Sequence, residues 1–128
     1  KGSNITAERV RFDFNLDHKL SDFEQRAVED QVNQWIKQDL DVTCAEYDKT
    51  YAKDIIKAHG EFWDKYPDQV KVYTIGKNAV AQGIIPTIAS CEVCGGPHVT
   101  HTGELGVFRI IKEESSAAGI RRIKAILE

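Results

Sequence analysis

Two kinds of hydrophobic spacing follow one another in the first part of the chain. Residues 9–14 alternate strictly between charged and apolar side chains, which is the period of a half-buried strand. From residue 22 onward, apolar side chains recur every three or four positions, which predicts one long amphipathic helix at about 22–39. Ser21 and Glu24 have the spacing of a capping box at its start. We expect its apolar stripe to pack in the core: Phe23, Ala27, Val28, Val32, Trp35, Ile36 and Leu40.

Five later segments have the alternation or the β-branched content of strands: 41–47, 70–75, 88–93, 106–112 and 120–127. The last of these also fits a short helix, but its isoleucines favour a strand. Between the first two segments, Asp48 can cap a short helix that Gly60 would stop, and an aromatic-rich loop follows at 61–68. Residues 77–87 and 113–119 are expected to be connections. Strands dispersed among helices without βαβ regularity predict an α+β fold, a mainly antiparallel sheet packed with one long and one short helix in a single domain.

The composition sets limits on the class of protein. A chain of 128 residues with 41% hydrophobic and 29% charged residues is long enough to form one globular domain. No apolar run approaches the ~20 residues that a membrane span needs, and no secretory signal opens the chain, so we expect a cytoplasmic protein without a membrane partner. The net charge of −3 hides an asymmetry, because residues 15–69 hold 7 Lys and Arg against 13 Asp and Glu, whereas residues 70–128 hold 7 against 5. Contact with nucleic acid would therefore be local.

Chemically active side chains concentrate between Cys91 and Gly106, where two thiols and two imidazoles lie close together. Thiolate and neutral imidazole are ligands that Zn²⁺ favours. Cys91, Cys94, His98 and His101 could close a structural zinc site, or Cys94 and His98 could bind zinc with ligands from elsewhere and leave a position open for water. Side chains three apart on a strand point to opposite faces, which disfavours pairing Cys91 with Cys94. A third interpretation is that neither residue binds metal.

The cysteines also allow readings without a metal. Cys94 and His98 could form a thiolate–imidazolium nucleophile, although the sequence shows no third group to orient the imidazole. Cys44 lies among small and β-forming residues, and we expect it to be buried as a small hydrophobic side chain. Gly95 and Gly96 would let the backbone approach a metal or ligand closely, because no Cβ stands in the way.

Four motifs follow one another in the second half of the chain: Cys94-Gly-Gly-Pro-His98, Thr102-Gly-Glu-Leu-Gly106, Phe108-Arg-Ile110 and Gly119-Ile-Arg-Arg-Ile-Lys-Ala125. In order and spacing they resemble the C-terminal half of the editing domain of alanyl-tRNA synthetase. The opening Lys-Gly-Ser-Asn-Ile-Thr resembles the start of the same half, so the resemblance spans nearly the whole chain. The editing domain of threonyl-tRNA synthetase and the free-standing alanyl-tRNA editing proteins are similar too. Pro97 is more typical of the threonyl branch, whereas Gly96 and residues 102–106 fit the alanyl branch better.

The resemblance implies a zinc-dependent hydrolase site. In that family a His-x3-His pair and the Cys and His of a Cys-x3-His motif hold zinc, and the site hydrolyses the ester between a wrong amino acid and the 3′ end of tRNA. Alanyl enzymes remove serine and glycine, and threonyl enzymes remove serine. Carried over to this sequence, Cys94 and His98 would be metal ligands, while His101 would not. The other implied positions are Gly95, Gly96, Thr102, Gly103, Arg121 and Arg122 toward substrate or tRNA, with Glu104 behind the metal ligands.

The roles of the two arginines stay open at this point. Arg121 and Arg122 would contact tRNA phosphate or buttress the pocket, or they would be ordinary solvated strand residues. Glu104 would be either a supporting group of the metal site or a solvated carboxylate.

The resemblance also implies partners and a missing part. Residues 1–128 would belong to an aminoacyl-tRNA editing domain and would lack the segment that carries His-x3-His, a spacing that none of the four histidines has. We therefore expect this chain alone to bind zinc weakly and to deacylate tRNA poorly. Its partners would be tRNA, of the alanine type, and the rest of a synthetase or of an editing protein. The alternatives are threonyl-type editing of Ser-tRNA and a non-catalytic tRNA-binding or structural zinc module.

Overall fold

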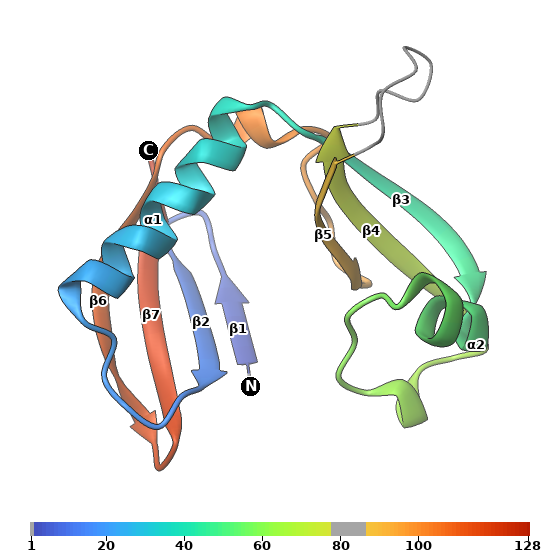
Figure 1. Ribbon diagram of the computed structural model, residues 1–128, viewed down its shortest axis with the longest axis horizontal. Helices are drawn as coiled ribbons and strands as arrows, with labels where there is room; N and C mark the ends of the chain where they lie inside the picture. The colour runs from blue at the N-terminus through green and yellow to red at the C-terminus, as the bar shows by residue number, and fades with distance from the viewer. Residues whose placement is uncertain (1, 78–86) are drawn as a thin grey trace. The chain divides into compact units, whose positions relative to one another are not determined.

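The computed structural model describes residues 2–77 and 87–128. It confirms the α+β prediction, with antiparallel strands, one long helix and one short one. The strands form two sheets, and the chain divides accordingly into two compact units, Lys1–Gln38 with Leu105–Glu128 and Asp39–Glu104 (Figure 1). Within the described residues, no helix is both long enough and apolar enough to cross a membrane.

The first unit is a four-stranded sheet with one helix across it. The strand order is β1–β2–β7–β6, and every neighbouring pair is antiparallel. Figure 1 shows α1 lying over the β6–β7 side of this sheet. The elements are β1 Gly2–Ile5, β2 Val10–Asn15, α1 Asp22–Lys37, β6 Phe108–Ala117 and β7 Ile120–Leu127. The sequence pattern predicts β2 and β7 but misses the short β1.

Strand β6 is longer than its pattern indicates. The connection expected at 113–119 is wrong, because residues 113–117 continue the strand and only a tight turn separates it from β7. Glu113 interrupts the apolar pattern, yet its side chain is fully buried beside Arg121. An ion pair therefore takes the place of an apolar contact in this part of the sheet.

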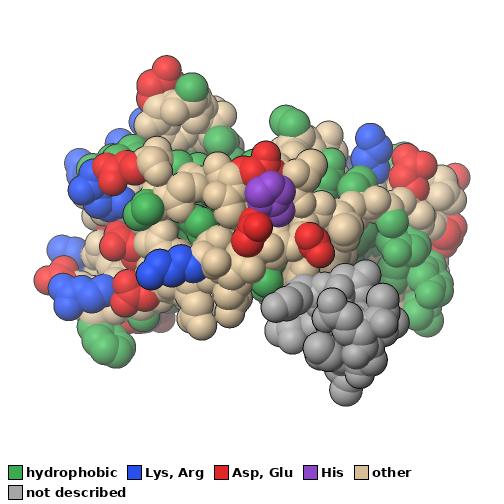
Figure 2. Space-filling view, turned by 90° about the horizontal axis from the view of Figure 1, so that it is seen from above, with side chains coloured by type: hydrophobic (Ala, Val, Ile, Leu, Met, Phe, Trp, Pro, Cys, Tyr) green, Lys and Arg blue, Asp and Glu red, His purple; other side chains and the backbone are tan. Residues whose placement is uncertain are grey.

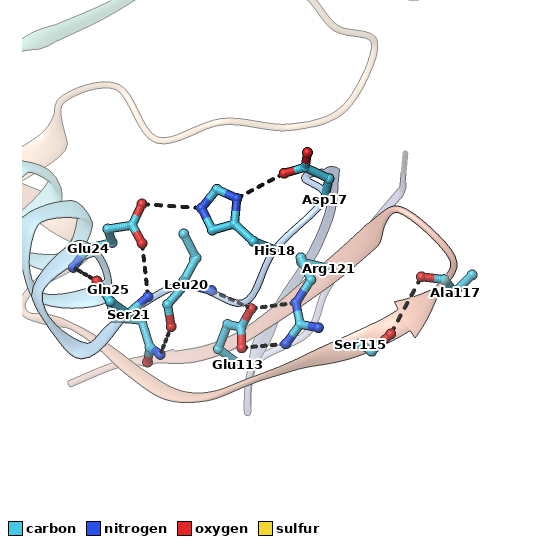
Figure 3. A network of polar contacts seen from close by, with 10 residues as sticks. All are labelled: Asp17, His18, Leu20, Ser21, Glu24, Gln25, Glu113, Ser115, Ala117 and Arg121. Carbon is cyan, nitrogen blue, oxygen red and sulfur yellow. Dashed lines mark hydrogen bonds and ion pairs between the residues drawn. The ribbon is translucent and has the colours of Figure 1, made fainter.

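The capping box expected at the start of α1 is present. The Glu24 N–H donates to Ser21 Oγ at 3.1 Å, and the Ser21 N–H donates to the Glu24 carboxylate at 3.0 Å (Figure 3). Each side chain thus satisfies a backbone donor that the first turn of a helix leaves without a partner.

The side of α1 that meets the sheet is more polar than predicted. Asn33 accepts the Phe108 N–H at 2.7 Å and donates to the Phe108 carbonyl at 2.8 Å, while Glu29 accepts the Ile110 N–H at 2.8 Å. These bonds cover the outer edge of β6, which would otherwise present unpaired backbone groups. Ile36 is buried as expected, but Phe23 is 80% exposed and Ala27 and Val28 are exposed too, so the prediction that the whole apolar stripe is core is wrong over its N-terminal half.

The second unit is a three-stranded antiparallel sheet in the order β3–β4–β5. Its buried core consists of Ala52, Ala58, Val70 and Val72. The predicted strands are all present, and the loop expected at 77–87 lies outside the described residues except for its two ends, which belong to β4 and β5. The elements are β3 Asp41–Asp48, α2 Lys49–Tyr51, η1 Ala52–Ile56, η2 Trp63–Lys65, β4 Gln69–Lys77, β5 Thr87–Val93 and η4 Thr102–Leu105.

The short helix begins where the sequence predicts but ends elsewhere. Asp48 Oδ1 accepts the N–H groups of Thr50 and Tyr51 at 3.0 and 3.3 Å, and the helix continues from α2 through the π-helical turn η1. It ends at Lys57, which adopts a left-handed conformation with φ of 59°. The expectation that Gly60 stops the helix is therefore wrong. Gly60 is enclosed by aromatic rings, since a Cβ there would lie 3.0 Å from Trp63.

Candidate metal and substrate site

The two faces of the β3–β4–β5 sheet carry different side chains. One face packs on the core of the unit and includes Cys91, whose Sγ accepts the Thr74 hydroxyl at 3.7 Å. On the other face, the register places Tyr73 opposite Cys44 on β3 and opposite Glu92 on β5. Cα partners on neighbouring strands project to the same side, so these three residues share the face away from the core. We call it the open face.

Cys94 follows β5 directly and belongs to the open face. Its N–H donates to the Lys71 carbonyl at 3.2 Å, and its thiol lies close enough to Tyr73 for its charge to act on the phenol. Cys91 and Cys94 therefore project to opposite faces, as strand geometry predicts. This arrangement disfavours the closed zinc site, which needs both thiols.

His98 lies over the open face at the end of the Cys94–His98 loop. Its Nδ1 is 3.0 Å from the Gly96 carbonyl, which can only accept, so Nδ1–H donates and the lone pair of the neutral imidazole lies on Nε2. The imidazole also stacks on the Tyr73 ring, with ring centroids 3.7 Å apart and planes inclined by 21°. The structure thus brings Cys94 and His98 into one neighbourhood around Tyr73.

Tyr73 and Cys44 are the neighbours that sequence reasoning missed. Burial raises the pKa of the Tyr73 phenol, and a hydrogen bond with Cys44 and the charge of Cys94 add to the effect. Cys44 itself is exposed, so the expectation that it is buried is wrong. The alternation along 70–75 places Tyr73 on the face away from Val70 and Val72, but its pairing with Cys44 depends on the strand register. The residue type alone predicts a buried side chain for Cys44.

A groove of about 380 Å³ begins at Cys94 and Gly95. Volumes of this size are typical of small-molecule sites. Its walls carry a cation and an anion, Lys71 and Glu46, beside apolar and aromatic surface. The lining residues are Glu46, Tyr66, Pro67, Gln69, Val70, Lys71, Val93, Cys94 and Gly95.

Thr102 and Gly103 bind the segment that enters β3. Thr102 is buried, and its Oγ1 accepts the Leu40 N–H at 2.7 Å while its own N–H donates to the Leu40 carbonyl at 2.8 Å. The Gly103 N–H donates to Asp39 Oδ1 at 2.9 Å, and a Cβ on Gly103 would collide with that carboxylate. Both residues belong to the short 3-10 helix η4, and the contacts described here join them to residues 39–40.

Glu104 and His101 belong to the same turn. Glu104 Oε2 accepts the Thr100 hydroxyl at 2.8 Å and the N–H groups of Thr100 and His101 at 2.9 and 3.1 Å, and these bonds lower the pKa of Glu104. His101 Nδ1 bonds the Asp39 carboxylate, which raises the pKa of His101, and its Nε2 lies 3.7 Å from Glu104. Both ring nitrogens of His101 thus face carboxylates.

Arg121 and Arg122 lie on β7 in the first unit, where each makes a bidentate ion pair. Arg121 Nε and Nη2 both lie 2.7 Å from the Glu113 carboxylate, whose Oε2 also accepts the Leu20 N–H at 3.2 Å (Figure 3). Arg122 holds Asp13 at 2.8 and 3.0 Å. With side chains only 17% and 26% exposed, the two arginines are not ordinary solvated residues, and both buttress this sheet.

The described residues offer only part of a ligand set for a metal ion. In residues 2–77 and 87–128, no three His, Cys, Asp or Glu side chains gather into a group that could hold an ion. Cys94 and His98 nevertheless offer one sulfur and one imidazole nitrogen, and the bond from His98 Nδ1 to a carbonyl is the support that metal-binding histidines usually have. The pair therefore fits zinc as a partial ligand set.

Charge on the surface is mixed. On the face drawn in Figure 2, Lys and Arg side chains of the described residues are interspersed with Asp and Glu.

Comparison with known proteins finds similar sequences among the aminoacyl-tRNA synthetases. Residues 70–124, which include the Cys94–His98 loop, match the family of the threonyl and alanyl tRNA synthetase second additional domain. The chain is 50% identical over its whole length to the alanine–tRNA ligase of Treponema denticola, 49% identical over 99% of its length to that of Borrelia hermsii, and 39% identical over 98% to that of Chloroflexus aurantiacus. It spans 19%, 19% and 14% of those three proteins. The chain therefore corresponds to a segment of alanine–tRNA ligases, and its residues 70–124 match the threonyl and alanyl tRNA synthetase second additional domain.

Proposed function

We propose that this chain supplies part of a zinc-dependent site that hydrolyses the ester of mischarged tRNA, with Ser-tRNA or Gly-tRNA for alanine as substrate. The observation that carries the proposal is the placement of Cys94 and His98 together on the open face of the sheet, with His98 Nδ1 engaged by Gly96. The similarity to alanine–tRNA ligases supports the alanine-type substrate.

Cys94 and His98 would hold the metal through Sγ and Nε2. Zinc, when bound, would polarise the ester carbonyl and lower the pKa of a water molecule toward neutrality. The Gly96 carbonyl keeps the proton of His98 on Nδ1, so that Nε2 is available as a ligand. The remaining zinc ligands would come from residues that are not among the described neighbours of Cys94 and His98.

Gly95 and Gly96 would let the substrate approach the ligands. A Cβ on Gly95 would meet nothing within 4 Å, and one on Gly96 would meet only Cys94 Sγ at 3.9 Å. Packing among the described residues therefore does not require a glycine at either position. Neither residue has a positive φ, so the backbone conformation does not require one. Access for a bulky 3′-terminal nucleotide accounts for two small residues here, and the adjoining groove would receive the aminoacyl group.

The test is deacylation of mischarged tRNA by the full-length protein. We expect Cys94→Ala to lower the rate on Ser-tRNA and Gly-tRNA for alanine at least 100-fold and to lower bound zinc, while the thermal midpoint and tRNA affinity are retained. Cys91→Ala is the matched control, because it removes a thiol three residues away that projects to the opposite face, and it should leave the rate unchanged.

Other results would point elsewhere. Full activity of Cys94→Ala would contradict the proposal. If the unmodified protein had no deacylation activity and Cys94→Ala lost tRNA affinity, the chain would be a tRNA-binding module. A preference for Ser-tRNA of the threonine type would assign threonyl-type editing.

A further inference from the structure

Tyr73 occupies a constrained position on the open face. It lies in β4, the central strand of its sheet, and its backbone pairs with Cys44 on one side and Glu92 on the other. A residue paired on both sides in mid-strand has little backbone freedom, and an aromatic side chain has only two rotatable bonds. The Tyr73 ring is therefore a rigid feature of the second unit.

His98, in contrast, has little else to hold its ring. It is exposed and lies in a loop that contains Gly95 and Gly96, the residues with the greatest conformational freedom. Its described contacts are the bond to the Gly96 carbonyl and the stack on Tyr73. The Gly96 bond is internal to the loop and selects the tautomer, but it cannot place the ring relative to the sheet.

We propose that Tyr73 is the positioning residue for His98: its ring, held by the central strand, sets the orientation of the imidazole beside Cys94. This inference rests on the proposed role of Cys94 and His98 as metal ligands. A ligand held in place before the metal arrives loses less conformational entropy on binding, and supporting contacts of this kind change metal affinity about 10- to 100-fold. Stacking requires the ring of Tyr73 and not its hydroxyl.

The experiment compares zinc affinity among variants of the full-length protein, by competition with a chromophoric chelator. Tyr73→Val keeps a strand-forming residue but removes the ring, and should weaken zinc binding roughly tenfold or more. Tyr73→Phe keeps the ring and should stay within about twofold of the unmodified protein. Tyr51→Leu is the matched control, because it removes a tyrosine stacked on Tyr47 at 5.8 Å, away from the open face, and should change nothing.

A second measurement does not depend on how the variants fold. With the histidine and tyrosine rings isotopically labelled, nuclear Overhauser contacts between the ring protons of Tyr73 and His98 should be present in the zinc-loaded unmodified protein. Their absence would overturn the proposal. So would unchanged zinc affinity in a folded Tyr73→Val variant, or equal losses in Tyr73→Val and Tyr73→Phe.

His98→Ala separates this inference from the proposed function. If His98→Ala loses zinc while Tyr73→Val retains it, only the positioning role of Tyr73 fails. If His98→Ala binds zinc as tightly as the unmodified protein, the ligand assignment itself fails and the positioning role falls with it.

Discussion

Thr102 offers the sharpest test of how the second unit is held together. Its Oγ1 accepts the Leu40 N–H at 2.7 Å, and both residues are buried, with exposed fractions of 4% and 6%. Thr102→Val keeps the shape of the side chain and replaces the accepting oxygen with a methyl group. The Leu40 N–H then has neither this partner nor water to bond.

The magnitude follows from the asymmetry of hydrogen bonding. A buried donor left without a partner costs about 1–3 kcal/mol, so we expect Thr102→Val to lower the free energy of unfolding by about 2 kcal/mol. Thr102→Ser keeps the oxygen and loses one methyl group, which costs about 1 kcal/mol or less. Thr102→Val, which loses the hydroxyl, should therefore be destabilised more than Thr102→Ser, which loses only the methyl group.

Urea unfolding of the 128-residue chain, followed by tryptophan fluorescence, measures this difference. With a denaturant dependence of about 1.5 kcal/mol per molar, the midpoint of Thr102→Val should fall by roughly 1.3 M, and that of Thr102→Ser by about half as much or less. Equal midpoints for the two variants would refute the reasoning, because the bond to Leu40 would then contribute nothing measurable.

Three further predictions concern other parts of the chain. Phe23→Ser should change stability by no more than about 0.5 kcal/mol, whereas Ile36→Ala on the same helix should cost roughly 2–4 kcal/mol in urea unfolding; a large effect at Phe23 would show that its face of α1 is covered. Glu113→Ala leaves Arg121 without its bidentate partner and should lower the thermal midpoint much more than Glu114→Ala, whose carboxylate is more exposed; similar shifts would contradict this. The bond to Asp39 raises the pKa of His101 above 6.5 and lowers that of Asp39 below 3.8. The contribution of His101 to stability is therefore complete below pH 6.5 and is lost as the pH rises through its raised pKa, while that of Asp39 is complete above pH 3.8 and is lost on acidification. The thermal midpoints of the original protein and His101→Ala should therefore differ most between pH 3.8 and pH 6.5. A difference that does not depend on pH would argue against the ion pair of His101 with Asp39.

Features encoded within a few residues could be predicted from the sequence. The capping box at Ser21 and the Asp48 cap need only donors and acceptors two or three residues apart, and the strand at 9–14 needs only its alternation. The separation of Cys91 from Cys94 followed from the two-residue period of a strand in the same way. Each of these depends on backbone geometry that the tertiary structure leaves unchanged.

The errors have a different cause. Phe23 has the residue type and spacing of a core position, but Asn33 and Glu29 bond the edge of β6 and so orient the helix with Phe23 outward. Gly60 has the composition of a helix stop, but the ring of Trp63 is what requires a glycine there. In each case a contact with another element decided between two roles that the local sequence allowed equally.

The candidate site shows the same division. The sequence by itself determined its chemistry, since the thiol of Cys94, the imidazole of His98 and the two glycines between them are adjacent in the chain. The tertiary structure decided their surroundings: it stacked His98 on Tyr73, exposed Cys44 on the same face, and joined His101 to Asp39 across 62 positions of sequence. Strand pairing and loop closure bring together residues with no local relation, so these neighbours carry no signature in a window of a few residues.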